Sequence, residues 1–463
     1  MMAWVGTHLP VFLFVVLAVL LFSGYPVAFV LGGIAIFFGA IGIVFGVFEP
    51  MMFFNLLPRI WGGIAANSIL VAVPMFIFMG TVLERSGVAN DLLHALQVLT
   101  RRIPGGLAMS VTLMGTIMAA TTGIVGASVV MLTLVALPPM MQRGYQKELA
   151  VGTIASAGTL GILIPPSIML VIMGDLLQVS VGTLFAAAVL PGLLLSLLYL
   201  VYICALSFWK PQLAPPLPPE IGPKNAREFW VLMGRSFVPP SFLIVLVLGS
   251  IFGGWATPTE AAGVGAAGAL VLAWFNGRLK LKDLNAMIES AALTNALVFF
   301  IFFGATLFAF VFRALGGDDI VTEVLKALGL DTGWEILAFV MALVFLLGFF
   351  FDWIEICLIV LPVFAPVLKA VDFGPHLGEG GAIVFLTWFI ILMSVNLQTS
   401  FLTPPFGFTL FYMKGTVPPS ITMAHIYRGI VPFVVLQVAG LVLVMAAPEL
   451  ALWLPRKVGF LSY

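Results

Sequence analysis

Long apolar runs recur along the whole chain, and they restrict its fold more than any other feature. A bilayer core of about 30 Å needs roughly 20 apolar residues of helix, and a helix satisfies its backbone hydrogen bonds within one segment. We therefore expect an all-α polytopic membrane protein in a lipid bilayer. The runs are residues 11–22, 27–48, 68–83, 149–173, 184–208, 237–252, 261–275, 291–312, 336–351, 382–395 and 430–447.

The charge content agrees with this expectation and narrows the function. Only 9% of the residues are charged, whereas soluble domains carry about 25%. Lys+Arg and Asp+Glu both number 20, so nothing indicates a nucleic-acid partner. Cys204 and Cys357 lie far apart in apolar runs, and the four histidines are scattered. We therefore predict no metal cluster and no enzyme.

The first apolar run has two interpretations. It could be a secretory signal peptide, but no basic segment precedes it, and a second run follows directly after Gly24-Tyr25-Pro26. We expect it to be retained as a membrane span.

A Pro-rich segment near the middle of the chain divides it into two similar halves. Residues 209–235 hold six prolines between positions 211 and 223 and predict an extended linker. Each half contains a glycine turn, an interrupted apolar region and a Pro-Pro pair in the same order, which indicates an internal repeat rather than chance recurrence of prolines. We expect N-terminal scaffold helices (1–66), a first half (67–208), the linker (209–235), further scaffold helices (236–290) and a second half (291–463).

The interrupted regions predict two re-entrant helical hairpins, at about residues 107–141 and 351–371. In the first, Thr122, Gly123 and Ser128 supply backbone freedom and hydroxyl groups at the tip. In the second, Asp352 and Glu355 place two carboxyl groups in an apolar region, which marks a candidate functional site. Asp352 has an alternative role as the N-cap of the second arm, with Glu355 as its capping-box partner. The two roles are compatible.

The Pro-Pro segments predict cation sites. Proline interrupts the helical hydrogen-bond ladder and frees carbonyl oxygens, which can replace the water shell of a sodium ion. Gly161, Ile164 and Pro166 would offer carbonyls in the first half, and Ser400, Thr403 and Phe406 in the second. The alternative is a pair of kinked helices packed through small residues. Candidate substrate-binding residues lie beside these segments and at the two hairpin tips, namely Gly123, Ser128, Ser167, Asp352, Glu355, Asn396, Gln398 and Thr399.

Four motifs resemble the large membrane subunit of tripartite ATP-independent periplasmic (TRAP) transporters, and the resemblance covers nearly the whole chain. One departure is the first hairpin tip, which reads Thr122-Gly123-Ile124 where many family members have Ser-Gly-Ser. Thr122 keeps a hydroxyl group there and Ile124 does not. The motifs are residues 158–167 (GTLGILIPPS), 255–262 (WATPTEAA), 348–352 (GFFFD) and 402–407 (LTPPFG).

The resemblance implies an inverted-repeat, elevator-type transporter of the ion transporter superfamily kind, located in a bacterial inner membrane. It implies sodium as the coupling ion, a small four-helix membrane subunit, and a periplasmic substrate-binding protein that delivers a small organic acid. The sequences around Asp352 and Asn396 are typical of a branch that we associate with 2-oxo acids or other small carboxylates. Family sodium ligands map onto Gly161, Ile164, Pro166, Gly348, Ser400, Thr403 and Phe406. Thr122 is a further candidate sodium ligand, because it keeps a hydroxyl group at the tip that departs from the family pattern.

Other functions remain as alternatives. A binding-protein-independent sodium/anion symporter has a similar architecture, and a co-purifying small subunit would argue against it. A channel is disfavoured because the sequence shows no ring of charges or pore motif. A membrane enzyme is disfavoured because Asp352 and Glu355 have no His or Cys companion.

Overall fold

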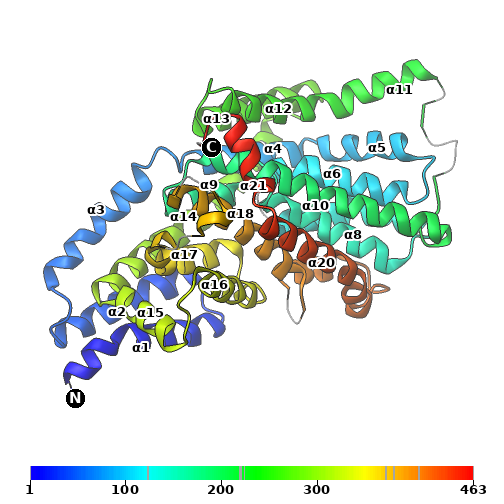
Figure 1. The fold of residues 1–463 in the computed structure, drawn as a ribbon. Coiled ribbons are helices and arrows are strands. Elements are labelled where there is room, and N and C mark those ends of the chain that lie inside the picture. Colours follow the sequence, from blue (N-terminus) through cyan, green and yellow to red (C-terminus); the bar gives the residue numbers. More distant parts are fainter. Residues whose placement is uncertain are drawn as a thin grey trace.

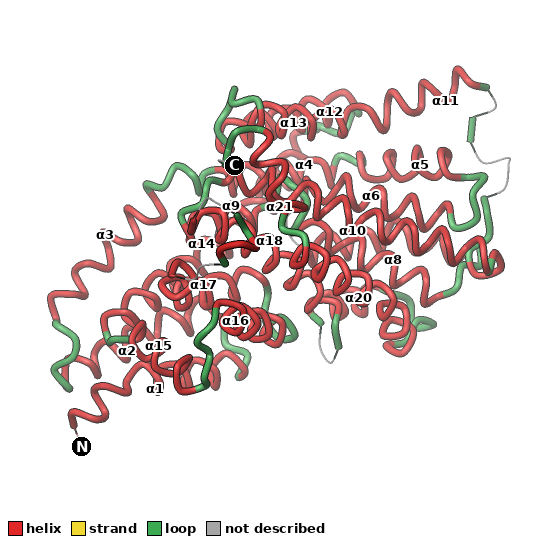
Figure 2. Tube along the Cα trace, viewed as in Figure 1, coloured by secondary structure: helices red, strands yellow, loops and turns green. Residues whose placement is uncertain are grey.

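The described part of the chain consists of helices and connecting loops, and no strand occurs in it (Figure 2). The structure, a computed structural model, describes residues 2–122, 125–217, 222–223, 225–370, 373–378, 381–404 and 407–461. Within these residues, nine helices are long and apolar enough to cross a membrane, or ten when the pair α4–α5, bent by 63°, counts as one span. The chain is a multi-pass membrane protein.

Seven helices of the first half recur in the same order in the second half, and we call these sets the first and second repeats. The repeat seen in the sequence is therefore also a repeat of helix order. The first repeat is α4 (Ala72–Arg85), α5 (Val88–Thr100), α6 (Gly106–Thr122), α7 (Val125–Gln142), α8 (Lys147–Thr159), α9 (Ile168–Leu177) and α10 (Val181–Trp209); the second is α14 (Leu281–Ala314), α15 (Gly317–Ala327), α16 (Gly333–Leu347), α17 (Trp353–Ala370), α18 (Gly381–Leu402), α19 (Phe408–Thr416) and α20 (Met423–Ala446).

Equivalent turns begin the second helix of each repeat. Gly87 precedes α5 with φ 74°, and Gly316 precedes α15 with φ 88°. Glycine adopts positive φ without the steric cost that a Cβ atom imposes. The glycine turns that mark both halves in the sequence therefore make the same sharp change of direction in both repeats.

Helices of the two repeats exchange packing partners reciprocally. α8 packs against α20 while α18 packs against α10, and α7 packs against α19 while α17 packs against α9. The helices that precede the repeats behave in the same way, because α2 (Val27–Val44) packs along α14 and α13 (Pro258–Phe275) packs along α4. Such an exchange is expected when two halves are related by a rotation, since each contact then occurs twice.

The start of α13 explains the residue types of one sequence motif. Thr257 Oγ1 accepts a hydrogen bond from the Glu260 backbone N–H (3.3 Å), and the Glu260 carboxylate accepts one from the Thr257 N–H (2.8 Å). Pro258 occupies the first helical position, where no N–H is needed. The threonine, proline and glutamate of residues 255–262 thus form a capping box that fixes where this helix begins.

The central linker is only partly extended. Residues 211–213 form a short 3-10 turn, η4 (Pro211–Leu213), and helix α11 (Ala226–Leu232) continues through η5 (Met233–Phe237) into α12 (Val238–Phe252). Residues 226–235, which we assigned to the linker, are therefore helical. The prolines end at Pro223, and the sequence after it carries no residue that breaks a helix before Pro239.

A short arm runs along one edge of the helices and packs on α14 (Figure 1). It is built from η1 (Pro50–Asn55), α3 (Leu56–Ile60) and η2 (Trp61–Ala65), which follow one another without a break. Phe54, Leu57 and Trp61 are exposed on it. Two further helices complete the ends of the chain, α1 (Met2–Phe22) and α21 (Glu449–Lys457), and a short turn η6 (Gly374–His376) precedes α18.

Candidate functional site

The first repeat contains a broken helix at the first Pro-Pro pair. Helix α8 ends at Thr159, the turn η3 (Leu160–Ile162) follows, and α9 begins at Ile168; we call residues 160–167 the first break. Every residue of this break is buried. The carbonyl oxygens of Gly161, Ile164 and Pro166 accept no hydrogen bond from the described part of the chain. These three oxygens are therefore buried acceptors with no hydrogen-bond donor among the described residues.

The second repeat is broken at the equivalent place. Helix α18 ends at Leu402 and α19 begins at Phe408; residues 403–407 are the second break, and Phe406 lies outside the described residues. The Thr403 N–H donates to the Ser400 carbonyl (3.0 Å), and its hydroxyl donates to the Thr399 carbonyl (2.8 Å). A donating hydroxyl keeps two lone pairs, so this bond does not prevent Thr403 from also binding a cation.

Gly348 and Ser400 are brought into direct contact. Gly348 follows α16, and a Cβ atom added to it would overlap the Ser400 hydroxyl. In the first repeat, the equivalent helices approach closely at Gly115 of α6, where an added Cβ would lie 2.8 Å from the Ala157 Cβ of α8. Glycine is therefore required in both repeats, where α6 meets the broken helix at α8 and where α16 meets the broken helix at α18.

The predicted hairpins correspond to two helix pairs. The first pair, α6–α7, covers the predicted range 107–141. The predicted range 351–371 contains α17 alone, and the helix that precedes it in the second pair is α16, at Gly333–Leu347. The apolar run at 336–351 carries one turn signal, Gly348 at the end of α16, and a single glycine is too weak a signal to separate this helix from the tip by sequence alone.

The tip of the second pair is organised by its two acidic residues. The Asp352 carboxylate accepts a hydrogen bond from the Trp353 N–H (2.8 Å), and the Glu355 carboxylate accepts one from the Asp352 N–H (3.3 Å). Helix α17 begins at Trp353, so Asp352 stands at the N-cap position. Its side chain satisfies the first N–H of the helix rather than the third, so only the Glu355 half of a capping box is formed.

The polar run on α18 is buried among other helices. Asn396 donates to the Met341 carbonyl of α16 (2.7 Å), and Gln398 donates to the Tyr199 hydroxyl of α10 (3.4 Å). Thr399 donates to the Val395 carbonyl of its own helix (2.8 Å). Asn396 and Gln398 thus connect α18 to α16 and α10. The Gln398 Oε1 atom has no hydrogen-bond partner in the described part of the chain.

The remaining predicted residues lie near the first pair and the first break. Ser167 donates its hydroxyl to the Ile162 carbonyl across the first break. Ser128 lines a cavity of about 10 Å³ between α6, α7 and α8, which is smaller than any substrate. Gly123 lies outside the described residues, and so does the side chain of Thr122.

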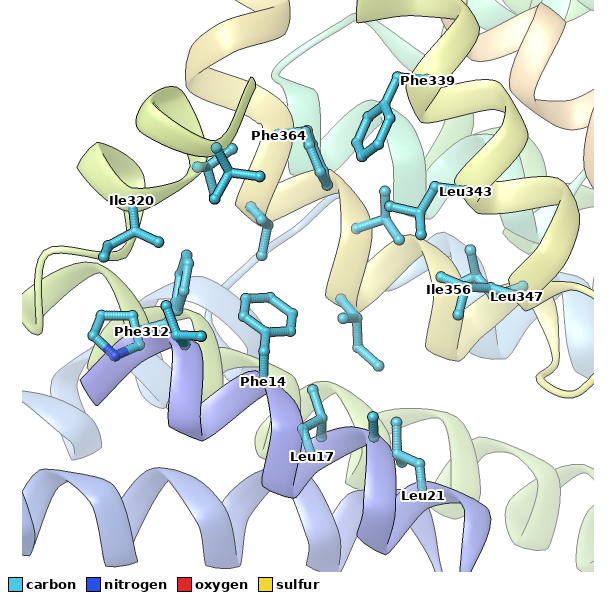
Figure 3. A pocket seen from close by; sticks show the side chains of 18 of the residues that line it. Phe14, Leu17, Leu21, Phe312, Ile320, Phe339, Leu343, Leu347, Ile356 and Phe364 are labelled. Carbon is cyan, nitrogen blue, oxygen red and sulfur yellow. The ribbon is translucent and has the colours of Figure 1, made fainter. Parts of the chain in front are cut away.

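Two larger cavities were not predicted. One, of about 530 Å³, lies between the arm, α14, α9 and α17, and Arg59, Asp175 and Arg313 line it. Asp175 was a usable signal, because it is an acidic residue within an apolar helix. The other, of about 340 Å³, lies between α1, α15, α16 and α17, and carbon atoms make up almost all of its wall (Figure 3).

Comparisons with known proteins give consistent similarities. A family model described as "Tripartite ATP-independent periplasmic transporter, DctM component" matches residues 14–450. The chain is 32% identical to the C4-dicarboxylate TRAP transporter large permease protein DctM of Pseudomonas aeruginosa, over 84% of this chain and 87% of that protein. It is 31% identical to the ectoine/5-hydroxyectoine TRAP transporter large permease protein UehC of Ruegeria pomeroyi, over 83% and 85% of the two chains.

Two further proteins are similar to the chain, one in sequence and one in fold. The isethionate TRAP transporter permease protein DctMQ of Oleidesulfovibrio alaskensis is 30% identical, over 83% of this chain and 58% of that protein. Among solved structures, the Alcanivorax borkumensis YdaH transporter aligns with a TM-score of 0.61 over 88% of this chain and 89% of that chain, at 14% identity. The likeness to that structure concerns the fold alone.

Proposed function

Because the chain belongs to the DctM family of TRAP transporter large permease subunits, and is therefore a transporter subunit and not an enzyme, we propose that it imports a small organic acid together with sodium ions. The observation that carries the sodium proposal is the first break, where three buried carbonyl oxygens accept no hydrogen bond from the described residues. Ser400, Thr403 and Gly348 supply the equivalent oxygens in the second repeat, with Phe406 and Thr122 as further candidates. Each break then holds one sodium ion.

The proposed motion is an elevator movement of the two helix pairs and the two broken helices against the rest of the chain. In this proposal the helix pairs are re-entrant hairpins whose tips lie at membrane depth. Reciprocal packing supports a mobile unit, since α7 contacts α19 and α17 contacts α9 across the two repeats. The two cavities interrupt the packing of α16, α17 and α9 against α1, α3, α14 and α15, although α17 still contacts α14 and α15, and loose packing at the cavities would permit sliding.

The proposed partners are a small four-helix membrane subunit and a periplasmic substrate-binding protein, which places the complex in a bacterial inner membrane. This chain spans 58% of the relative named DctMQ. In this proposal, the additional length of DctMQ contains a small subunit fused to the large one. The proposed substrate is a carboxylate or 2-oxo acid, in line with the C4-dicarboxylate named for another relative. Asp352 and Glu355 would repel such an anion unless a cation lies between them, so we assign them to the geometry of the tip.

The test is reconstitution in liposomes with both partners, an inward sodium gradient, and labelled succinate or isethionate as the substrate. We expect uptake only when the sodium gradient, the small subunit and the loaded binding protein are all present. Full uptake by the chain alone would favour the binding-protein-independent sodium/anion symporter. Full uptake with potassium in place of sodium would contradict sodium coupling.

A further inference from the structure

A polar cavity of about 530 Å³ lies away from both breaks and is not explained by the sodium sites. Its walls come from the arm, from the C-terminal part of α14, from the last turn of α9 and from the middle of α17. We call it the arginine chamber, after Arg59 and Arg313. Small-ligand sites in proteins have volumes of about 300–1,000 Å³, so the chamber is large enough for a small acid and several water molecules.

Arg59 is available to bind an anion. Its guanidinium lies over the Phe310 ring, 4.4 Å from the ring centroid. It makes no hydrogen bond or ion pair with the described part of the chain. A guanidinium that stacks on an aromatic ring keeps its N–H donors at the edge, where they fit a carboxylate in a bidentate manner.

Arg313 lies on α14 and is held by a bond that the sequence explains. It donates to the Pro362 carbonyl of α17 (2.7 Å), an oxygen left without its helical partner because Pro366, four residues on, has no N–H. The Asp318 carboxylate lies 3.8 Å away, and both side chains are about half exposed, so this ion pair is weak. The bond to Pro362 orients Arg313 and leaves other donors of its guanidinium for a ligand.

The charges of the chamber favour an anion. Asp175 is the one carboxylate among its lining residues, and its oxygen accepts a hydrogen bond from the Asn67 side chain (2.7 Å). Arg313 is weakly paired with Asp318 outside the lining, so Arg59 is the cation of the chamber that has no acidic partner in the described part of the chain. Asn55 and Thr306 add neutral polar groups to the wall.

We infer that the arginine chamber binds the anionic group of the transported organic acid at the boundary between the arm and α14 on one side and α9 and α17 on the other. This inference rests on the proposed function, because it names where the acid is held apart from the two breaks. The phosphate group of a lipid is also an anion, and the arginines of the chamber would recognise it in the same way. The apolar cavity that would suit an acyl chain shares α14 and α17 with the arginine chamber and is otherwise bounded by α1, α15 and α16, and no described residue lines both cavities.

The first test compares Arg59→Gln and Arg313→Gln with Arg143→Gln, which removes an exposed arginine outside the chamber. Uptake of succinate or isethionate is measured in the complete reconstituted system. We expect each chamber variant to raise the half-saturating substrate concentration about fivefold, as expected for losing one nearby charge in a solvated site. The half-saturating sodium concentration should stay at the wild-type value in both variants. The thermal stability should stay unchanged for Arg59→Gln and fall slightly for Arg313→Gln, which also loses the bond to the Pro362 carbonyl. Chamber variants that match Arg143→Gln would overturn the inference.

The second test does not depend on transport. Thr306→Cys is introduced with Cys204→Ser and Cys357→Ser, and its reaction with a sulfonatoethyl and a trimethylammonioethyl methanethiosulfonate is compared. We expect the anionic reagent to be favoured, the preference to fall about fivefold with Arg59→Gln, and succinate to slow the anionic reaction. Equal preference with and without Arg59 would refute an anion site, even if the wild-type system imports neither acid.

Changing the lipid composition of the vesicles distinguishes a lipid headgroup from the transported acid as the anion that the chamber binds. The labelling is repeated in vesicles of phosphatidylcholine alone and of phosphatidylcholine with phosphatidylglycerol. We expect the same rates in both. Protection by phosphatidylglycerol, with no effect of succinate, would assign the chamber to a lipid headgroup and overturn its assignment to the substrate.

Discussion

The two helix pairs have the same place in their repeats but different chemistry. The first pair, Gly106–Thr122 with Val125–Gln142, contains no Asp, Glu, Lys or Arg. The second pair carries Asp352 and Glu355 at its tip and ends close to Lys369. Both pairs pack on a broken helix, and both do so through a glycine. The glycine contact is therefore what the fold requires, and the acidic tip is specific to the second repeat.

The two breaks also differ in the kind of groups that they present. The first break presents backbone oxygens in a fully buried segment. The second adds a side chain, the Thr403 hydroxyl at the end of a buried polar run, to the backbone carbonyl of Ser400. If each break holds a sodium ion, the first site depends on backbone geometry, and the second is open to change by single side-chain substitutions. The following predictions test that distinction, in order of expected effect.

The largest effect is expected from Gly348→Ala. The added methyl group would overlap the Ser400 hydroxyl, and overpacking of a core costs about 1–3 kcal/mol. We expect a matching loss of thermal stability of the purified protein, together with loss of sodium-driven uptake because the second break is displaced.

A compensating change and a matched control make this prediction specific. Adding Ser400→Gly to Gly348→Ala removes the clash while keeping the backbone carbonyl, so uptake and stability should recover. Gly33→Ala in α2, where an added Cβ meets nothing within 4 Å, should have little effect. If Gly348→Ala behaves like Gly33→Ala, the close contact is not required.

The next effect concerns the acidic tip. Asp352→Asn keeps an oxygen that can accept the Trp353 N–H, so we expect only a modest loss of uptake and stability. Asp352→Ala removes the cap and should cost about 0.5–2 kcal/mol. Thermal unfolding and uptake measured on both variants decide the role. Equal damage from Asn and Ala would show that the negative charge is needed, for instance to bind a cation.

A smaller effect on stability, with a specific effect on sodium, is expected at Thr403. Thr403→Ser keeps the hydroxyl and should preserve the half-saturating sodium concentration, whereas Thr403→Val should raise it. The loss of the bond to the Thr399 carbonyl alone should cost about 1 kcal/mol or less. Uptake measured over a range of sodium concentrations separates the two contributions.

Thr387→Val is the control for this change. Thr387 lies on the same helix and donates to the Ile383 carbonyl (2.8 Å) in the same i−4 pattern, away from the break. Its sodium dependence should match that of the wild type. An unshifted sodium curve for Thr403→Val would remove Thr403 from the site.

Much of the all-helical fold was accessible from the sequence because its signals are local. Apolar length predicts membrane helices, and Gly87, Gly316 and the Pro-Pro pairs mark turns and breaks through backbone constraints of one residue type. Their order revealed the repeat. Where the local signal is a single residue, the prediction failed to resolve the structure. Gly348 follows the end of α16 at Leu347, but an isolated glycine in an apolar run is also tolerated within a helix, so the sequence predicted one run over residues 336–351.

The arginine chamber could not be predicted for a different reason. Arg59, Asp175 and Arg313 come from three distant parts of the chain and meet only through tertiary packing. The bond from Arg313 to the Pro362 carbonyl likewise joins residues 49 positions apart. The sequence showed that Asp175 is an acid in an apolar helix, but it gave no partner, since Asn67 lies 108 positions away.

The smallest effect is expected at Asn396, and it tests how the second pair is held. Its side chain donates to the Met341 carbonyl of α16, as the Thr116 hydroxyl of α6 bonds the Ser196 hydroxyl of α10 (2.6 Å) in the first pair. Hydrogen bonds between membrane helices contribute about 0.6 kcal/mol on average. We therefore expect Asn396→Leu and Thr116→Val to lower thermal stability slightly and equally, with the half-saturating substrate concentration unchanged. If Asn396→Leu instead raises that concentration while Thr116→Val does not, Asn396 contacts the substrate, as its place in the polar run of the sequence suggested, and the two pairs differ in binding as well as in charge.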